Sequence, residues 1–277
     1  MPLFLVAVCA CERTDHVPAY LDLSSPTVNT DGSTEGSGSN KITDGWVYVN
    51  DQAAGVWEFP SKVPVLGSGS ANVKVIAGVP RNGVLDDRVQ YPFYATWSGQ
   101  LVLEPEGHTD LHPAFTYFDG LEFFVEDFEG VGFALDVEAE SDTTLDPVTD
   151  PLLVFEGDRS ATVHLDTGHN FLRCSSFEEF TIGAGPVYLE LDYRCDHDFL
   201  IGTYYTQSST VVRTPYLFVN ATKRADGGMP WNKIYVDLSE LMLVPGTEDK
   251  KFYLEMKLEE DEPSAEFYID NVKLIHP

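Results

Sequence analysis

Apolar and polar residues alternate along much of the chain, and the pattern is clearest between residues 187 and 193. In the stretch VYLELDY, alternate side chains form one apolar set and one mixed set: Val187, Leu189, Leu191 and Tyr193, and then Tyr188, Glu190 and Asp192. Residues two apart share a face of a β-strand, so the stretch predicts a strand with one face toward a core and one more polar face.

Short segments of this kind recur between residue 121 and residue 277, and turn-rich joints separate them. The predicted strands cover residues 161–165, 179–182, 187–193, 200–205, 216–221, 232–237, 251–257 and 266–274. About eight short strands with such joints are typical of a two-sheet jelly roll. We therefore expect an all-β protein whose larger part is a jelly-roll β-sandwich.

The earlier part of the chain also predicts short strands. WVYVN (46–50) alternates, NDQAAG turns and VWEF (56–59) returns, which indicates a hairpin. The aromatic group from Tyr91 to Trp97 predicts a domain edge that packs on its neighbour. The predicted divisions are a signal remnant (1–11), a flexible tether (12–41), a small β-domain (42–98), connecting strands (99–120) and the jelly roll (121–277).

The first residues resemble a targeting signal that is removed from the mature protein. The apolar run from Leu3 to Ala10 is too short to cross a membrane and fits the tail of a secretion signal, although no basic residue precedes it. VCAC resembles a bacterial lipobox, in which a small residue precedes the lipidated cysteine. Ala10 makes Cys11 the better match, and a Gly/Ser/Thr-rich tether follows. The alternative is an ordinary buried first strand.

Two further resemblances concern the domains. The hairpin resembles the PEGA-type β-domains of bacterial envelope proteins over about 40 residues, through Val47, Val49, Asn50, Asp51 and Gly55, then Pro60, Pro64 and VKVIAG (73–78). Residues 121–277 resemble carbohydrate-binding-module and galactose-binding-like jelly rolls, through EDFEG (126–130), WNKIYVDLS (231–239), FYLEM (252–256) and FYIDNVKL (267–274). The jelly-roll fold hosts many functions, so this resemblance implies binding only as an expectation.

Charge narrows the range of partners. The chain has 45 acidic and 17 basic residues, a formal net charge of −28. Such a surface repels phosphate backbones and anionic headgroups, which argues against nucleic acid and against membrane attachment by charge. Neutral ligands, cations and basic proteins remain open, and the charge can also serve solubility alone.

The jelly-roll resemblance implies two candidate sites. Binding modules of this kind present aromatic rings to the faces of sugars, and the available residues are Tyr188, Tyr193, Tyr204, Tyr205 and Trp231. The alternative for Trp231 is core packing, and on a strand only one of Tyr204 and Tyr205 can face outward. Such jelly rolls also hold a structural Ca²⁺ where the first and last strands meet, for which Asp127, Glu129 and Asp270 are the matching carboxylates. The alternative is a plain polar edge.

The spacing of the cysteine and histidine residues does not indicate a metal site. Cys174 and Cys195 could form a disulfide in an exported protein or remain buried thiols, and the chain has no Cys-x-x-Cys pair for a structural zinc. His108, Asp110 and His112 would share a face on a strand, but the neighbouring Gly107 and Pro113 favour a loop.

The sequence carries no G-x-S-x-G, P-loop or H-E-x-x-H motif, so we expect no enzyme. The expectation is a non-catalytic bacterial cell-envelope lipoprotein of the outer membrane, periplasmic or surface-exposed, that binds glycan through its jelly roll. The alternative is a structural or accessory subunit of an envelope protein assembly, and a glycan-active enzyme comes third.

Overall fold

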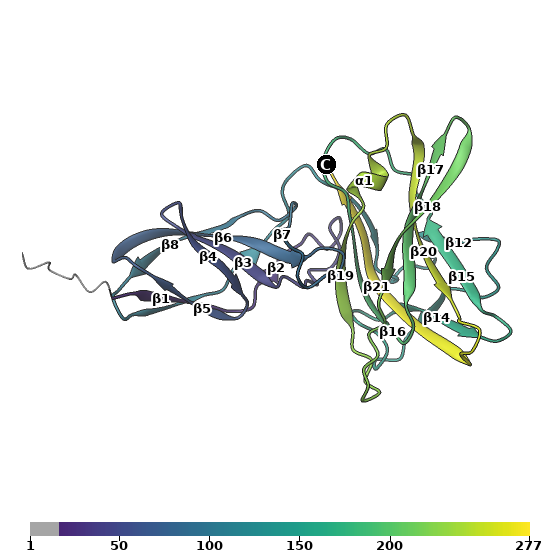
Figure 1. Cartoon of the computed structure of the whole chain (residues 1–277), viewed down its shortest axis with the longest axis horizontal. Coiled ribbons are helices and arrows are strands. Elements are labelled where there is room, and N and C mark those ends of the chain that lie inside the picture. The colour runs from purple at the N-terminus through teal and green to yellow at the C-terminus, as the bar shows by residue number, and fades with distance from the viewer. Residues whose placement is uncertain (1–16) are drawn as a thin grey trace, which may run out of the picture.

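The computed structural model describes residues 17–277, which form two β-domains arranged end to end (Figure 1). The signal remnant and the predicted lipidation site at Cys11 lie outside these residues. The described residues contain one helix, α1 (Ser239–Met242), and no helix long and apolar enough to cross a membrane.

The N-terminal domain is a pair of facing sheets. One sheet has the order β5-β1-β9, the other has the order β4-β3-β6-β7 with β8 also on β6, and β10 pairs β2 beside them. Its strands are β1 (Ala19–Leu23), β2 (Thr27–Val28), β3 (Asp44–Val49), β4 (Gln52–Glu58), β5 (Ser61–Val65), β6 (Gly69–Pro80), β7 (Arg88–Gln90), β8 (Trp97–Leu103), β9 (His108–Leu111) and β10 (Ala114–Phe115).

The predicted hairpin is confirmed as β3 and β4. Its turn residues Asn50 and Asp51 have φ angles of 48° and 63°, a conformation that Asn and Asp tolerate and that tight hairpin turns require. The PEGA-type resemblance itself stays a prediction.

The predicted flexible tether is wrong for the part that the structure describes. β1 pairs antiparallel with β5 and parallel with β9, and β2 pairs with β10. Leu21 and Leu23 are buried in the domain core, while Tyr20 and Asp22 alternate with them. Alternation in AYLDL therefore outweighs the turn-rich composition that follows it, and the domain extends from residue 17 to about residue 117.

The C-terminal domain confirms the predicted two-sheet sandwich. One sheet has the order β13-β14-β21-β16-β19 with β11 also on β21, and the other has the order β12-β15-β20-β17-β18. Its strands are β11 (Glu122–Glu126), β12 (Leu135–Val137), β13 (Asp146–Val148), β14 (Ser160–Asp166), β15 (Phe171–Ser176), β16 (Tyr188–Cys195), β17 (Phe199–Gln207), β18 (Thr210–Val219), β19 (Asn232–Asp237), β20 (Glu248–Lys257) and β21 (Ser264–His276).

The core of the sandwich lies between its sheets. Leu189 and Leu191 of β16, with Phe252 and Leu254 of β20, belong to one continuous buried cluster. The strand predicted at residues 232–237 is confirmed as β19, whereas the one predicted at 179–182 is wrong, because only Phe180 forms an isolated bridge there.

The two domains share a buried aromatic interface. Tyr91 contacts Tyr188 and Tyr235 of the jelly roll, with ring centroids 5.4 and 4.9 Å apart. The loop after β6 extends the contact, because the backbone N–H of Asn82 donates to the Tyr235 carbonyl at 2.8 Å. The aromatic group beginning at Tyr91 therefore packs on its neighbour, as predicted.

Candidate functional site

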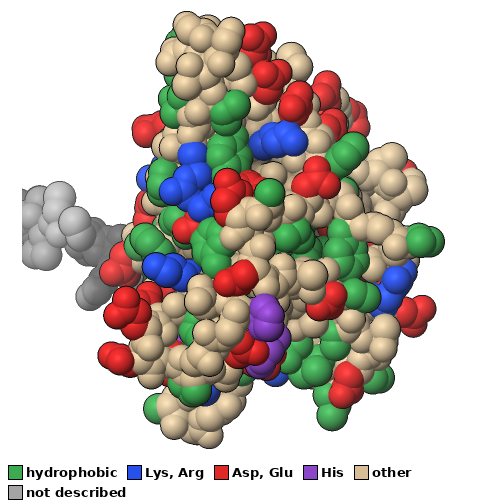
Figure 2. All heavy atoms as spheres, turned by 90° about the vertical axis from the view of Figure 1, so that its right-hand side faces the viewer, with side chains coloured by type: hydrophobic (Ala, Val, Ile, Leu, Met, Phe, Trp, Pro, Cys, Tyr) green, Lys and Arg blue, Asp and Glu red, His purple; other side chains and the backbone are tan. Residues whose placement is uncertain are grey.

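A groove of about 610 Å³ crosses the outer face of the five-stranded sheet of the jelly roll. Figure 2 looks onto this side of the molecule, where Lys and Arg side chains gather with Asp and Glu beside them. The lining side chains come from β15, β17, β18 and β20 and from neighbouring loops: Glu138, Glu140, Arg173, Ser175, Glu179, Tyr204, Thr206, Val211, Arg213, Asp249 and Lys251.

Tyr204 supplies the aromatic surface of the groove. Its ring lies 4.9 Å from the ring of Tyr253, which is fully buried on the neighbouring strand β20. Gly202 makes this packing possible, because a Cβ at that position would lie 2.4 Å from the Tyr253 ring. The Tyr204 hydroxyl donates to Glu138 Oε2 at 2.9 Å, and burial together with this carboxylate raises the pKa of Tyr204.

Two arginines are fixed over Tyr253 by one carboxylate. Arg173 Nε and Arg213 Nη1 each donate to Glu255 Oε2 at 2.7 Å, and both guanidinium groups lie within 6 Å of the Tyr253 ring. Burial works against the charge of Arg173, but its hydrogen bond to Glu255 raises the pKa. The side chains of the groove are thus held in position before any ligand arrives.

Among the aromatic residues predicted to bind ligand, only Tyr204 lines this groove. Its neighbour Tyr205 does not, since adjacent strand residues face opposite ways. Arg173, Arg213 and Glu138 also line the groove, and none of them was predicted from the sequence. Alternation in FLRCSS and TVVRTP is the signal that could have placed each arginine on an outward face, but nothing in the sequence indicates that the two meet.

Tyr188 is corrected from ligand residue to interface residue. It is 4% exposed, its ring packs edge-on against Phe93, and its hydroxyl donates to Asp237 at 3.2 Å. The alternation predicted an outward position, which is right, but the N-terminal domain covers that face.

Tyr193 and Trp231 line a second hollow of about 360 Å³, at the junction of the two domains. Tyr193 is 4% exposed, and its hydroxyl accepts a hydrogen bond from the Asn232 amide at 2.8 Å. Trp231 is half-buried and lies 5.2 Å from the Phe155 ring. The structure therefore does not assemble the predicted residues into one aromatic platform.

Asp127, Glu129 and Asp270 do line a common hollow, of about 340 Å³, where β11 and β21 meet. Their oxygens already accept internal hydrogen bonds: Glu129 Oε1 accepts the backbone N–H of Asp158 at 2.8 Å, and Asp270 Oδ2 accepts the Ser160 hydroxyl at 2.6 Å. Burial raises the pKa of Asp270 to about 7.

This arrangement does not fit a calcium ion as it stands. No three His, Cys, Asp or Glu residues within positions 17–277 come together closely enough to hold a metal. A carboxyl group with a raised pKa is also a weak ligand for a hard cation, which needs ionised oxygens. Calcium stays a prediction of the resemblance.

The remaining residues that the sequence singled out, two cysteines and a histidine, do not form a binding site. Of the two alternatives for Cys174 and Cys195, the structure has the buried thiols and not the disulfide: they lie on β15 and β16, in different sheets, and burial raises the pKa of each to about 12. The loop predicted around His108 is wrong, because β9 begins there. The His108 ring stacks on the Tyr20 ring, with the ring centroids 4.9 Å apart, and its Nδ1 forms a hydrogen bond with Asp22.

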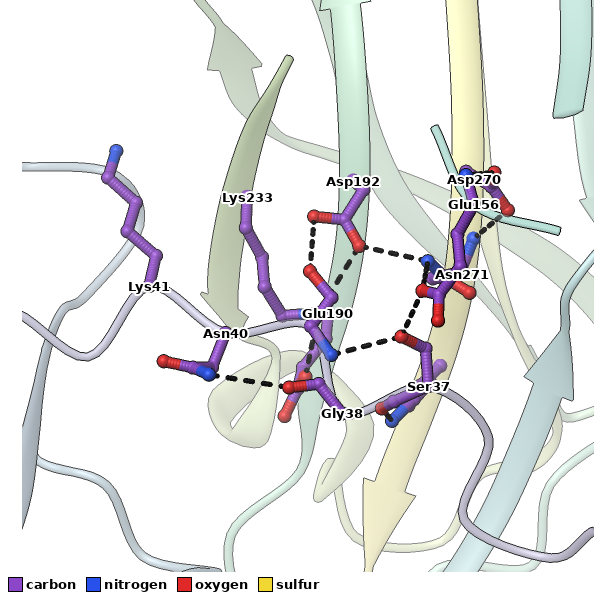
Figure 3. A network of polar contacts seen from close by, with 12 residues as sticks. Ser37, Gly38, Asn40, Lys41, Glu156, Glu190, Asp192, Lys233, Asp270 and Asn271 are labelled. Carbon is purple, nitrogen blue, oxygen red and sulfur yellow. Dashed lines mark hydrogen bonds and ion pairs between the residues drawn. The ribbon is translucent and has the colours of Figure 1, made fainter. Parts of the chain in front are cut away.

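A buried polar network joins the segment before β3 to the outer face of β16, β19 and β21 (Figure 3). Glu190 is fully buried, and its carboxylate lies 3.1 Å from Lys233 Nζ and accepts the Tyr91 hydroxyl at 2.5 Å. Burial favours the neutral acid, but Lys233 and Lys273 lower the pKa of Glu190 below its ordinary value. This network holds the two domains together.

Comparison with known proteins finds similar solved structures but no family. No family model and no curated protein matches the chain. Three solved structures are similar to it: a carbohydrate-binding module of the β-sandwich superfamily (14% identity, 83% of this chain and 84% of that one, TM-score 0.39), a module specific for non-crystalline cellulose (12%, 53% and 90%, 0.38), and the family 11 module of a Clostridium thermocellum cellulosomal cellulase (15%, 57% and 95%, 0.36). Likeness at these TM-scores carries no conclusion about a ligand.

Proposed function

We propose that this protein is a non-catalytic glycan-binding protein and that the Tyr204 groove is its binding site. The observation that carries the proposal is the exposed sheet face on which an aromatic ring lies beside two guanidinium groups, both fixed by Glu255. Ligand sites combine apolar surface with a small number of positioned polar groups, and this face has both.

The chemistry of the groove suits a chain of sugar hydroxyls. A tyrosine ring packs against the C–H face of a sugar ring, while guanidinium and carboxylate groups donate to and accept from hydroxyl pairs. Because Glu255 and Glu138 fix Arg173 and Tyr204, little side-chain entropy is lost when a ligand binds.

Charge balance in the groove favours a neutral glycan. The lining has three cationic side chains, Arg173, Arg213 and Lys251, and four acidic ones. A polyanion would meet more carboxylates than cations there, within a protein that is already strongly acidic.

The two alternative functions have less support. The aromatic group from Tyr91 to Tyr94, which could have docked an assembly partner, is buried against the jelly roll. Acid–base catalysis would use a carboxyl group with a raised pKa that a substrate can reach, but Asp270, whose pKa is raised, is 1% exposed and its oxygens accept internal hydrogen bonds. Display at a bacterial envelope through Cys11 stays a prediction, which mass spectrometry of the mature N-terminus would check.

The first prediction concerns Tyr204→Ala. Removing the ring takes away the aromatic surface, so glycan affinity should fall about tenfold or more, which corresponds to about 1.4 kcal/mol. A glycan array with the intact protein, with and without calcium, identifies the ligand, and calorimetric titration of that ligand measures the loss.

Tyr205→Ala is the matched control, because the adjacent ring lies outside the groove. Its affinity should stay within about twofold of the parent value. Equal losses in the two variants, or no binding by a folded protein to any glycan on the array, would overturn the proposal.

A further inference from the structure

The hollow at the domain junction is built by both domains. Lys41, Asn82 and Leu85 come from the N-terminal side, and Phe218 and Trp231 come from the jelly roll. Its wall is fixed, since Asn82 accepts the backbone N–H of Asp237 at 2.9 Å and donates to the Tyr216 hydroxyl at 3.0 Å. Its volume of about 360 Å³ is in the range of small-ligand sites.

The charge of this hollow is opposite to that of the whole protein. Lys41 and Arg224 are the charged residues of its lining, and no carboxylate contributes to the lining. In a chain with 45 acidic and 17 basic residues, this is an unusual surface. It is also distinct from the Tyr204 groove, where acidic side chains outnumber basic ones.

Neither cation is neutralised by the residues that the structure describes. Lys41 is half-buried, and its Nζ donates to the Asn232 amide oxygen at 2.7 Å. Burial lowers the pKa of Lys41, as expected for an ammonium group without a carboxylate partner. Figure 3 shows the Lys41 side chain running away from Glu190 and Asp192. Arg224 is exposed, and within positions 17–277 its side chain forms no ion pair.

The carboxylates of the surrounding loops have other partners. Asp198 Oδ1 accepts the backbone N–H of Ala221 at 2.6 Å, and Asp226 Oδ1 accepts that of Gly228 at 2.9 Å. The neighbouring cation Lys223 does form an ion pair, with Asp196 at 3.4 Å, and it does not line the hollow. The two lining cations are therefore free for an anion brought by a ligand.

Aromatic and amide groups complete the lining. The Phe218 side chain is 70% exposed, the half-buried Trp231 also contributes to the lining, and Asn220 and Asn232 add amide groups. Exposed rings pack against the apolar face of a sugar, and amides pair with hydroxyls. Cations in the same hollow add a charge-assisted hydrogen bond to a carboxylate.

We propose that the junction hollow is a second binding site, which takes a carboxylate-bearing sugar such as a hexuronic acid. Lys41 and Arg224 hold the carboxylate, and Phe218 and Trp231 contact the sugar ring. The negative charge of the whole protein does not prevent this, since at about 0.1 M salt charges beyond about 10 Å are largely screened. The ligand is a free uronic acid or a uronic acid residue of a longer chain.

Calorimetric titration of the intact protein tests the site with three probes: galacturonate, a trimer of galacturonic acid, and the neutral trimer of galactose. We expect an acidic probe to bind and the neutral trimer to bind at least about tenfold more weakly. Binding of the monosaccharide indicates a free uronic acid as ligand, and binding of the trimer alone indicates a longer chain. Equal affinity for the acidic and neutral trimers, or no binding of either acidic probe, overturns the proposal.

Substitutions of the lining residues test whether the uronic acid binds in the junction hollow. Arg224→Gln and Phe218→Ala change exposed side chains and should each weaken uronate binding about tenfold, and Lys41→Gln should do the same if it folds. Lys223→Gln is the matched control and should have no effect. An unchanged affinity in Arg224→Gln, or an equal loss in Lys223→Gln, overturns the proposal.

Tyr204→Ala separates this site from the groove. It should leave uronate binding unchanged, and a loss of uronate binding in this variant would place the acid in the groove and overturn the inference. A neutral glycan that binds and is lost with Tyr204, without uronate binding, would leave the proposed function in place and remove only the junction site.

Discussion

Lys273 has an unusual environment for a lysine. It is fully buried on β21, its ammonium group donates to the Ser37 carbonyl, and it lies 5.4 Å from the centre of the Tyr117 ring. Burial lowers its pKa to about 8, despite the nearby carboxylate of Glu190. Because burial disfavours the charged form, the protonated Lys273 lowers the free energy of unfolding at neutral pH.

This cost predicts a pH dependence of stability. Between pH 8 and pH 10.5 the unfolded chain keeps the Lys273 proton while the folded protein loses it, so this residue's contribution to the unfolding free energy rises with pH, by up to roughly 3 kcal/mol. Lys273→Met should remove that rise. Denaturant unfolding of parent and variant at pH 7.5 and pH 10 measures the difference, and parallel curves would contradict the prediction.

At the scale of elements, the pairing of β17 with β20 builds the floor of the groove. Gly202 faces Tyr253 across the pair, and the missing side chain leaves the space that the tyrosine ring occupies. Tyr253 in turn supports Tyr204 from below. Gly202 thus determines where the Tyr253 ring lies, and with it the position of the Tyr204 ring.

Gly202→Ala should therefore disturb both stability and binding. The added methyl group has to displace a ring held between Arg173, Arg213 and Tyr204, so we expect a loss of about 1–3 kcal/mol in unfolding free energy and weaker glycan binding. Gly132→Ala is the control, because a Cβ there meets no atom within 4 Å. Thermal unfolding compares them, and equal melting temperatures would refute the expected strain.

The elements also show what the sequence could and could not predict. Alternation in β16 correctly separated Leu189 and Leu191 from Glu190 and Asp192, because strand geometry alone decides which side chains share a face. It could not show that both faces are buried, since the second is covered by residues distant in sequence. Likewise, the sequence predicted that one of Tyr204 and Tyr205 faces outward but not which one. The Arg173–Glu255–Arg213 arrangement depends on strand order.

At the scale of the whole molecule, the two domains share one buried cluster. Tyr188, Tyr235 and Ile275 of the jelly roll belong to the same buried cluster as the N-terminal core. Separating the domains would expose these rings to water and break the hydrogen bonds that Tyr91 and Tyr117 donate to Glu190 across the interface.

We therefore predict a single calorimetric unfolding transition for the intact protein. The calorimetric and van't Hoff enthalpies should agree, because neither domain keeps its stability once the interface opens. Two resolved transitions, or a ratio of the enthalpies well above one, would show that the domains unfold independently.

The order of strands in the jelly roll has a consequence for the protein's synthesis. β21 pairs with β11, β14 and β16, and it comes after all three in the chain. While a ribosome is still adding residues before position 264, those strands have no central partner, and their apolar sides stay open to chaperones and proteases. Because β21 joins these three strands, we expect a premature stop within it to yield a chain that is degraded rather than a shortened binder.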